Sequence, residues 1–174
     1  MQERPWIKTF REYGIAAEVA AAPHASVTAM LEAAMQRYAT KTAFVSFGQR
    51  LSFADVDRLS RDFAAWLQAQ GVKRGDRIAV MTPNILAFPV AMLGIVRAGA
   101  VQVNVNPLYT ARELAHQLQD AGAETIVIFN GSTATLAEVL DQTPVKRVVT
   151  AGLALRADSP LPNPPVDARL SGAV

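Results

Sequence analysis

The chain has 174 residues, 51% of them hydrophobic, which suffices for one domain with a packed core. Lys and Arg exceed Asp and Glu by only 17 to 15 and the charges are interspersed, which argues against nucleic-acid binding. The absence of cysteine excludes disulfides, thiolate metal sites and a cysteine nucleophile. The first 20 residues mix charged and apolar positions, unlike a signal peptide, and no apolar run is long enough to cross a bilayer. We therefore expect a cytoplasmic protein.

Residues 1–42 are predicted to form an amino-terminal helical region. Ser26 has the position of an N-cap for a helix that runs to about residue 39, because apolar residues then recur at helical spacing. Three aromatic residues lie earlier, in weakly patterned sequence: Trp6, Phe10 and Tyr13. These aromatic side chains either cover an edge of the domain or form a partner-binding surface, since aromatic residues are enriched in interfaces.

Residues 43–155 are predicted to form an α/β subdomain. It begins with two short strands, 43–47 and 50–53, which flank Gly48 and Gln49 and indicate a hairpin. Ser52 and Asp55 then have the spacing of a capping box, which predicts a helix over 54–70.

From residue 77 onward, strands and helices alternate. The predicted strands are 77–81, 101–105, 125–129 and 147–150. The predicted helices begin at Asn84, at the capping box formed by Thr110 and Glu113, and at Ser132 or Thr133. The first of these helices is apolar on nearly every face, and Pro89 is expected to kink it. Repeated βα units predict a mostly parallel sheet with helices on both faces.

The last segment, residues 156–174, changes in character. It holds four of the ten prolines and lacks a periodic apolar pattern. We predict that it is disordered or a non-native continuation, so that its deletion should leave the thermal midpoint nearly unchanged.

A parallel sheet binds ligands at the carboxyl ends of its strands, and the loops there are 82–84, 104–109 and 130–133. They contain no dinucleotide-binding glycine motif, no P-loop and no acidic residue that ends a strand. The sequence therefore indicates no catalytic, cofactor-binding or metal-binding residue. Weak candidates for the rim of a substrate or coenzyme A site are Asn106, Tyr109, Asn130 and Ser132. Turn formation and helix capping explain the Asn and Ser residues more economically.

Residues 131–135 (Gly-Ser-Thr-Ala-Thr) are superficially similar to a phosphate-binding loop, but the second glycine and a following Pro-Lys-Gly are absent. A helix cap is the favoured interpretation over a nucleotide site. The two histidines, His24 and His116, lie far apart in the sequence, and no serine stands in a nucleophile elbow, so a hydrolase triad has no support.

Three motifs carry a family resemblance. They are Leu-Ser-Phe-Ala-Asp-Val at 51–56, Arg-Ala-Gly-Ala-Val at 97–101, and the longer run Asn-Val-Asn-Pro-Leu-Tyr-Thr-Ala-Arg-Glu-Leu at 104–114. The first two resemble the first and second core motifs of the adenylate-forming, acyl-activating enzyme superfamily. The third is more specific and resembles bacterial long-chain fatty-acyl-CoA ligases. The likeness runs from about Trp6 to Thr150.

The resemblance implies that the chain is an amino-terminal portion of such a ligase, an incomplete subdomain of the adenylate-forming fold. Family enzymes convert ATP, fatty acid and CoA to acyl-CoA, AMP and pyrophosphate through acyl-AMP, and ATP, Mg²⁺ and CoA are implied for the full-length enzyme. The 174 residues contain neither the family's Thr-Ser-Gly-Thr-Thr-Gly-x-Pro-Lys-Gly loop nor its carboxy-terminal lysine region. We therefore expect no activity from the chain alone and no cofactor bound to it.

The implied partner is the remainder of the ligase, in the cytoplasm or peripherally at the inner face of the cell membrane. Without that remainder, an apolar surface along 85–96 is expected to be exposed and to favour self-association. The alternative is a stand-alone α/β module that binds a small ligand or a partner, with loops 104–109 and 130–133 as its pocket.

Overall fold

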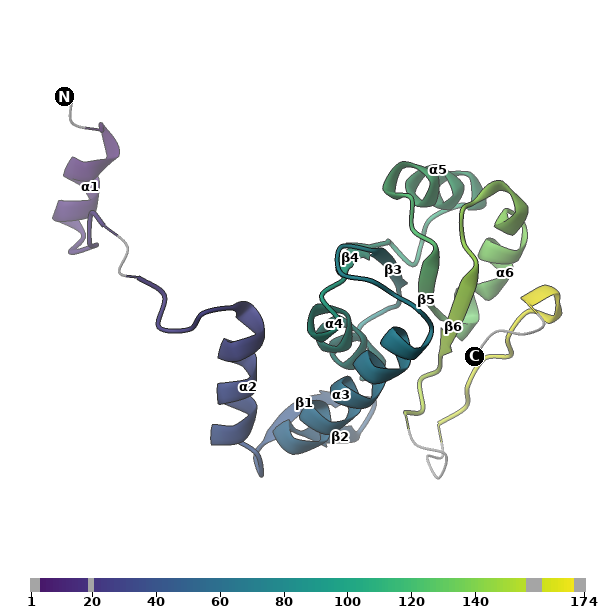
Figure 1. The fold of residues 1–174 in the computed structure, drawn as a ribbon, viewed down its shortest axis with the longest axis horizontal. Coiled ribbons are helices and arrows are strands. Elements are labelled where there is room, and N and C mark those ends of the chain that lie inside the picture. Colours follow the sequence, from purple (N-terminus) through teal and green to yellow (C-terminus); the bar gives the residue numbers. More distant parts are fainter. Residues whose placement is uncertain (1–3, 19–20, 156–160, 171–174) are drawn as a thin grey trace.

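The computed structural model describes residues 4–18, 21–155 and 161–170, and at its centre lies a four-stranded sheet between two layers of helices (Figure 1). The strands are β3 (Arg77–Met81), β4 (Val101–Asn104), β5 (Thr125–Phe129) and β6 (Arg147–Ala151). Their order is β4-β3-β5-β6 and every pair is parallel, so Ile78 lies opposite Gln102 on one side and Thr125 on the other. The predicted parallel sheet is confirmed.

Helices cover both faces of the sheet, as predicted. On one face, α5 (Ala111–Ala121) and α6 (Thr133–Ala137) pack over a core that includes Leu118, Ile126 and Leu136. On the other face, α3 (Phe53–Ala69) and α4 (Ala87–Arg97) pack over a core that includes Leu67 and Ile95. Because both faces of β3 and β5 are covered, these strands are nearly continuous runs of apolar residues.

A hairpin precedes the sheet, and its turn differs from the prediction by one residue. The hairpin consists of β1 (Thr42–Ser46) and β2 (Gln49–Ser52), which pair antiparallel. Ser46 pairs with Gln49, so the turn residues are Phe47 and Gly48 rather than Gly48 and Gln49. Both have positive φ, 49° and 76°, which is the backbone of a primed two-residue turn.

The start of α4 also differs from the prediction. Asn84 does not cap the helix, which begins at Ala87 without a hydrogen-bonded side-chain cap. Pro89 is the third residue of α4, and the first four N–H groups of a helix have no intrahelical partner, so the predicted kink has no cause. Every residue of α4 is buried or half-buried. The expectation of an exposed apolar surface along 85–96 is therefore wrong, because α3 and the sheet cover it.

Two further helices precede the hairpin, α1 (Trp6–Glu12) and α2 (Val27–Arg37). The side chain of Ser26 accepts a hydrogen bond from the Ala29 N–H, which confirms the predicted N-cap of α2. Helix α1 lies apart from the sheet and buries none of its residues, and Trp6 and Tyr13 are exposed (Figure 1).

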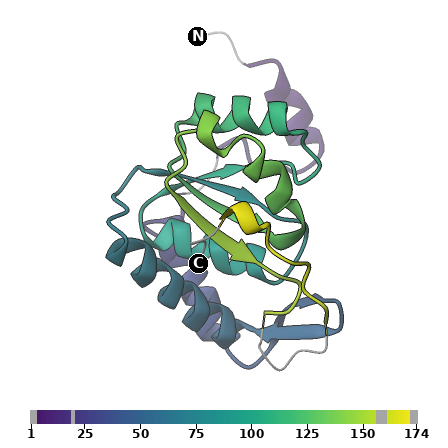
Figure 2. The same cartoon turned by 90° about the vertical axis from the view of Figure 1, so that its right-hand side faces the viewer.

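Part of the carboxy-terminal segment packs against the body of the protein, contrary to the predicted disorder. Residues 161–170 run back beside β6 and end in a 3₁₀ turn, Ala168–Leu170 (Figure 2). Leu170 is buried in the same core as Leu136 and Val139. Leu170 provides a buried apolar contact and Asp167 adds a hydrogen bond to Thr133, and neither contact requires a periodic apolar pattern. The rest of the predicted tail, 156–160 and 171–174, lies outside the described residues.

Within the part of the chain that the structure describes, no helix has both the length and the hydrophobicity that a membrane span requires.

Candidate functional site

The carboxyl edge of the sheet is the candidate site, because the order of the strands reverses beside β3. After β3 the next strand, β4, lies to one side, whereas β5 lies on the other side. In open α/β sheets, ligands bind in the crevice outside the carboxyl ends of two such strands. The crevice between β3 and β5 is therefore the place to look for unsatisfied polar groups.

Two polar side chains, each with an oxygen that lacks a hydrogen-bond partner, lie at the ends of these neighbouring strands. Thr82 follows β3 and is 8% exposed, and its Oγ1 atom has no partner. Asn130 follows β5, and its Oδ1 atom also has none. Met81 pairs with Ile128, so both residues lie just beyond the paired part of the two strands. Buried polar atoms are costly to leave unpaired, so a ligand or a water molecule would be stabilised here.

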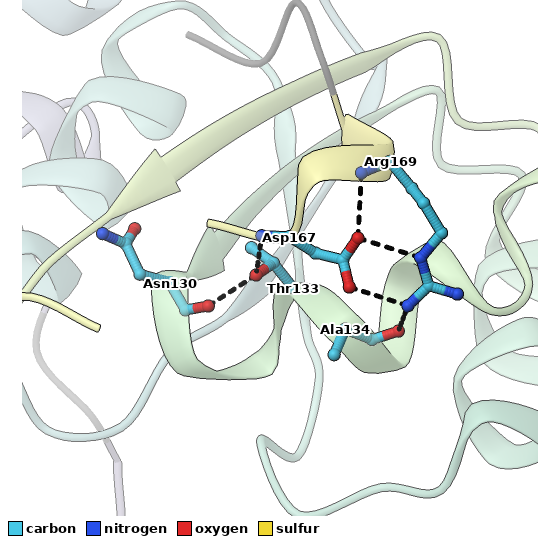
Figure 3. A network of polar contacts seen from close by, with 5 residues as sticks. All are labelled: Asn130, Thr133, Ala134, Asp167 and Arg169. Carbon is cyan, nitrogen blue, oxygen red and sulfur yellow. Dashed lines mark hydrogen bonds and ion pairs between the residues drawn. The ribbon is translucent and has the colours of Figure 1, made fainter. Parts of the chain in front are cut away.

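The loop after β5 forms a small polar network (Figure 3). The Thr133 hydroxyl donates to the Asn130 carbonyl at 2.6 Å and accepts the Asp167 N–H at 3.0 Å. Ser132 is buried and precedes α6, but its side chain makes no capping hydrogen bond. Helix capping, which the sequence favours for Ser132, is thus not its role in the structure.

The carboxy-terminal segment holds this loop from outside. Arg169 donates to both carboxylate oxygens of Asp167, through Nε at 2.9 Å and Nη2 at 2.7 Å, and its Nη2 lies 3.5 Å from the Ala134 carbonyl (Figure 3). The hydrogen bonds from Arg169 lower the pKa of Asp167 to about 2, so this carboxylate stays charged in all but strong acid. The loop after β5 is therefore tied to residues 167–169.

Asn106 and Tyr109 lie in the loop after β4, on the far side of β3 from Asn130. The Asn106 side chain accepts the Leu108 N–H at 3.0 Å, and its carbonyl accepts the Tyr109 N–H at 3.1 Å. Asn106 is thus a turn former, as the more economical interpretation expects. Tyr109 packs against the α5–α6 side of the core. No hydrogen bond joins these two residues to Asn130 or Ser132 in the described residues.

Thr82 is the residue of this site that sequence reasoning did not select. Its signal is a polar residue directly after a buried strand at the point where the strand order reverses, and that order is known only from the fold. Among residues 4–18, 21–155 and 161–170, no three His, Asp or Glu side chains come together as metal ligands. The groups at this edge are hydroxyls and an amide, which can bind and orient a ligand.

Two hollows flank the sheet. An apolar one of about 250 Å³ lies between α4 and the β5–β6 edge, and its lining includes Phe63, Val90, Val127, Val149 and Leu155. A polar one of about 220 Å³ lies at the opposite, amino edge, and its lining includes Asp76, Arg77, Glu124 and Arg147. Neither includes Thr82 or Asn130.

Comparison with known proteins places this chain in a family. Residues 31–172 match the AMP-binding enzyme family. The long-chain-fatty-acid–CoA ligase of Escherichia coli O157:H7 is 50% identical over 125 residues, which are 71% of this chain and 22% of that protein. The ligase of the same name from Yersinia pestis is 43% identical over 148 residues, which are 84% of this chain and 26% of that protein.

Solved structures agree with this likeness. The crystal structure of a long-chain-fatty-acid-CoA ligase from Archaeoglobus fulgidus superimposes with a TM-score of 0.71 at 27% identity, over 79% of this chain and 29% of that one. The chain spans 22% to 26% of the length of the two curated relatives named above. Because the family match extends over well more than half of its residues, this chain belongs to the AMP-binding enzyme family.

Proposed function

We propose that this chain is the amino-terminal α/β unit of a long-chain fatty-acid–CoA ligase. The intact enzyme would convert fatty acid, ATP and CoA to acyl-CoA, AMP and pyrophosphate through acyl-AMP, with Mg²⁺. The observation that carries the proposal is the 50% identity over 125 residues to a ligase of that name. We place it in the cytoplasm, or peripherally at the membrane that supplies its apolar substrate.

Within that enzyme, the unit would act as a scaffold and as one rim of the substrate or coenzyme A site. Thr82, Asn130 and Ser132 are the residues proposed for the rim, supported by the unpaired oxygens of Thr82 and Asn130 at the sheet's carboxyl edge. Asn106 and Tyr109 are weaker candidates, because one is used in a turn and the other in the core.

The charged steps of the reaction need groups that bind phosphate and a cation that offsets developing charge. The 174 residues contain no phosphate loop of the family type. We therefore propose that the chain alone releases no AMP from ATP, CoA and oleate above a control without protein. Clear turnover in material free of host ligase would overturn this.

A chimaera tests the family function. The matching amino-terminal region of the E. coli ligase is replaced by that of this chain, and acyl-CoA formation is measured with oleate. We expect activity within about tenfold of the parent enzyme, since the core positions of closely related units are exchangeable when volume and pattern are kept. The control chimaera carries Ile95→Asp, which disrupts the unit and should be inactive. A folded chimaera without activity would contradict the proposal.

The rim is tested in the active chimaera. Thr82→Val and Asn130→Leu should raise KM for CoA or fatty acid and leave kcat nearly unchanged, as expected for groups that bind but do not react. The exposed α3 residue Arg58, changed to Ala, is the control. Unchanged kinetics in both rim variants would remove Thr82 and Asn130 from the site.

A second function, a stand-alone module that binds a small ligand, is favoured by the same two unpaired oxygens. Titration of the isotope-labelled chain with ATP, CoA and palmitate separates the two functions. Saturable shifts of the Thr82 and Asn130 amide signals would favour the module. Their absence, together with an active chimaera, would favour the ligase unit.

A further inference from the structure

The polar hollow of about 220 Å³ lies at the amino edge of the sheet, where three strands begin. Arg77, Thr125 and Arg147 are the first residues of β3, β5 and β6, and all three line the hollow. The other lining residues are Gly75, Asp76, Gly122 and Glu124. Since β5 pairs with both β3 and β6, the two arginines start two strands apart, about 10 Å between their backbones. Both nevertheless line one hollow.

The two carboxylates of this amino-edge hollow are already engaged by the chain. Asp76 accepts the Lys73 N–H at 2.8 Å through its Oδ2 atom, in the turn before β3. Glu124 accepts from the ammonium group of Lys146 at 2.6 Å through its Oε1 atom. The negative groups are therefore held by contacts within the protein, and they leave the two arginines as the groups that a ligand can engage.

The two guanidinium groups have donors to spare. Arg147 donates to the Thr125 hydroxyl at 3.5 Å, the outer limit for a hydrogen bond, and pairs with no carboxylate among the described residues. The side chain of Arg77 makes neither a hydrogen bond nor an ion pair within the described part of the chain. A guanidinium carries five N–H donors in a planar fork that matches the oxygens of a phosphate. The hollow thus offers unused donors and unpaired positive charge.

The charge around the hollow is also positive. Residues 73–77, 124, 146 and 147 include five Lys or Arg and two Asp or Glu. Such an excess of cations raises the local concentration of anions. The described residues that line the hollow include no aromatic and no large apolar side chain, so a nucleobase would have nothing to stack on. These features favour a small anion over a nucleotide.

We propose that the amino-edge hollow binds inorganic phosphate, and binds pyrophosphate more tightly, between Arg77 and Arg147. Arginine forks bind phosphate oxygens two at a time, and the two phosphoryl groups of pyrophosphate can each meet one fork. The hollow lies at the edge of the sheet opposite Thr82 and Asn130. The proposal does not depend on the ligase activity, because anion binding is measured on the 174-residue chain and not on the chimaera.

Calorimetric titration at constant ionic strength, in a buffer free of phosphate, tests the proposal. We expect saturable binding of one pyrophosphate per chain, binding of phosphate at least about tenfold weaker, and binding of AMP no tighter than that of phosphate. Absence of saturable pyrophosphate binding would overturn the proposal. Tighter binding of AMP than of pyrophosphate would also overturn it, since the hollow would then hold a nucleotide.

Neutral variants of the two arginines locate the site. Arg77→Gln and Arg147→Gln should each weaken pyrophosphate binding by about tenfold, because each removes one fork. Arg112→Gln is the matched control, since Arg112 is exposed near the start of α5, at the other end of that helix from Gly122. It makes the same change in net charge and should stay within about twofold of the parent. Equal losses in all three variants would show a general charge effect and overturn the proposal.

A variant with the opposite sign separates binding from damage to the fold. Glu124→Gln removes a carboxylate from the hollow and frees the ammonium group of Lys146, so pyrophosphate affinity should rise several-fold. A misfolded variant would lose affinity instead, and the thermal midpoint of each variant checks folding independently. If folded Glu124→Gln bound pyrophosphate no better than the parent, the anion would not lie in this hollow and the proposal would be wrong.

Discussion

Helices α4 and α5 both have 11 residues, but they are held in place in opposite ways. Helix α5 begins with a complete capping box between Thr110 and Glu113 and ends at Gly122, whose φ is positive. Helix α4 lacks a side-chain cap, and each of its residues is buried or half-buried. Local signals define α5, whereas packing defines α4.

Packing around α4 includes one close approach and one buried arginine that makes two ion pairs. A Cβ atom on Gly94 would lie 2.6 Å from a ring carbon of Phe63, so α3 and α4 meet where only glycine fits. Arg97, whose side chain is 9% exposed, pairs with Asp57 of α3 at 2.6 Å and with Glu32 of α2 at 3.1 Å. Arg97 therefore joins three helices.

The largest expected effect comes from a charge in the buried face of α4. Ile95→Asp should destabilise the protein by about 4 kcal/mol or more, since Ile95 has no exposed surface and the carboxylate would lack a partner. Leu93→Ala should cost about 2–5 kcal/mol. Urea denaturation followed by circular dichroism measures both. His116→Ala, on the exposed face of α5, should stay within about 0.5 kcal/mol of the parent. A cooperative transition near that of the parent for Ile95→Asp would show that α4 is not held by burial.

The next effect tests whether the α5 side of the core also depends on packing, through Leu170. Leu170→Ala should cost roughly 2 kcal/mol, at the low end for a buried leucine because it lies in a short terminal turn. The measurement is the same urea titration. The exposed neighbour Ala168, changed to Ser, provides the control. If Leu170→Ala matched the parent, residues 161–170 would add nothing to stability, as the sequence predicts.

Arg97 gives a smaller and more specific test of α4. Arg97→Ala should cost roughly 1–3 kcal/mol, because it leaves Asp57 and Glu32 without their buried cation. Arg61 pairs with the same Asp57 at 3.0 Å but is more than half exposed, so Arg61→Ala should cost less than about 1 kcal/mol. Equal losses of unfolding free energy in the two variants would show that burial of the ion pair does not matter here.

The smallest effect concerns the cap of α5. Thr110→Ala should cost about 1 kcal/mol at neutral pH. The Thr110 N–H and hydroxyl lower the pKa of Glu113 below its ordinary value of 4.5, so the stability they contribute is present above that pH and is lost as the pH falls through the lowered pKa. The difference between parent and variant should therefore shrink in acid, measured by thermal denaturation at several pH values. A difference that grew on acidification would contradict this sign.

The contrast between α5, which local signals define, and α4, which packing defines, also explains what the sequence could predict. Capping boxes at Ser52 and Thr110, the cap at Ser26 and the strands of the sheet depend on local spacing, and they lie where expected. The start of α4 is set by burial of Ile85 and Leu86, so the local signal of Asn84 was misleading. Leu170 in the core depends on contacts far along the chain, with Leu136 and Val139, whereas Phe47 enters the turn because Ser46 pairs with Gln49.

For the candidate site, the sequence favours the carboxyl edge of the sheet, where the unpaired oxygens of Thr82 and Asn130 lie, and binding at this edge stays a prediction. Loop position alone identified Asn130 and Ser132. Thr82 emerges only when the strand order and its missing hydrogen-bond partner are known. Asn106 is of a residue type expected at a site, but its side-chain oxygen accepts a hydrogen bond from Leu108 within its own turn.

The position of β3 has a kinetic consequence. Ile78 pairs with Gln102 and also with Thr125. Strand β3 therefore pairs fully only after two strands that lie far along the chain have reached it. Closing such long loops costs chain entropy before the pairings compensate for it, which slows folding of parallel sheets. Helix α5 lies inside the longer of these loops, and its own cap allows it to form early. We therefore expect the docking of β5 beside β3 to be slower than the formation of α5.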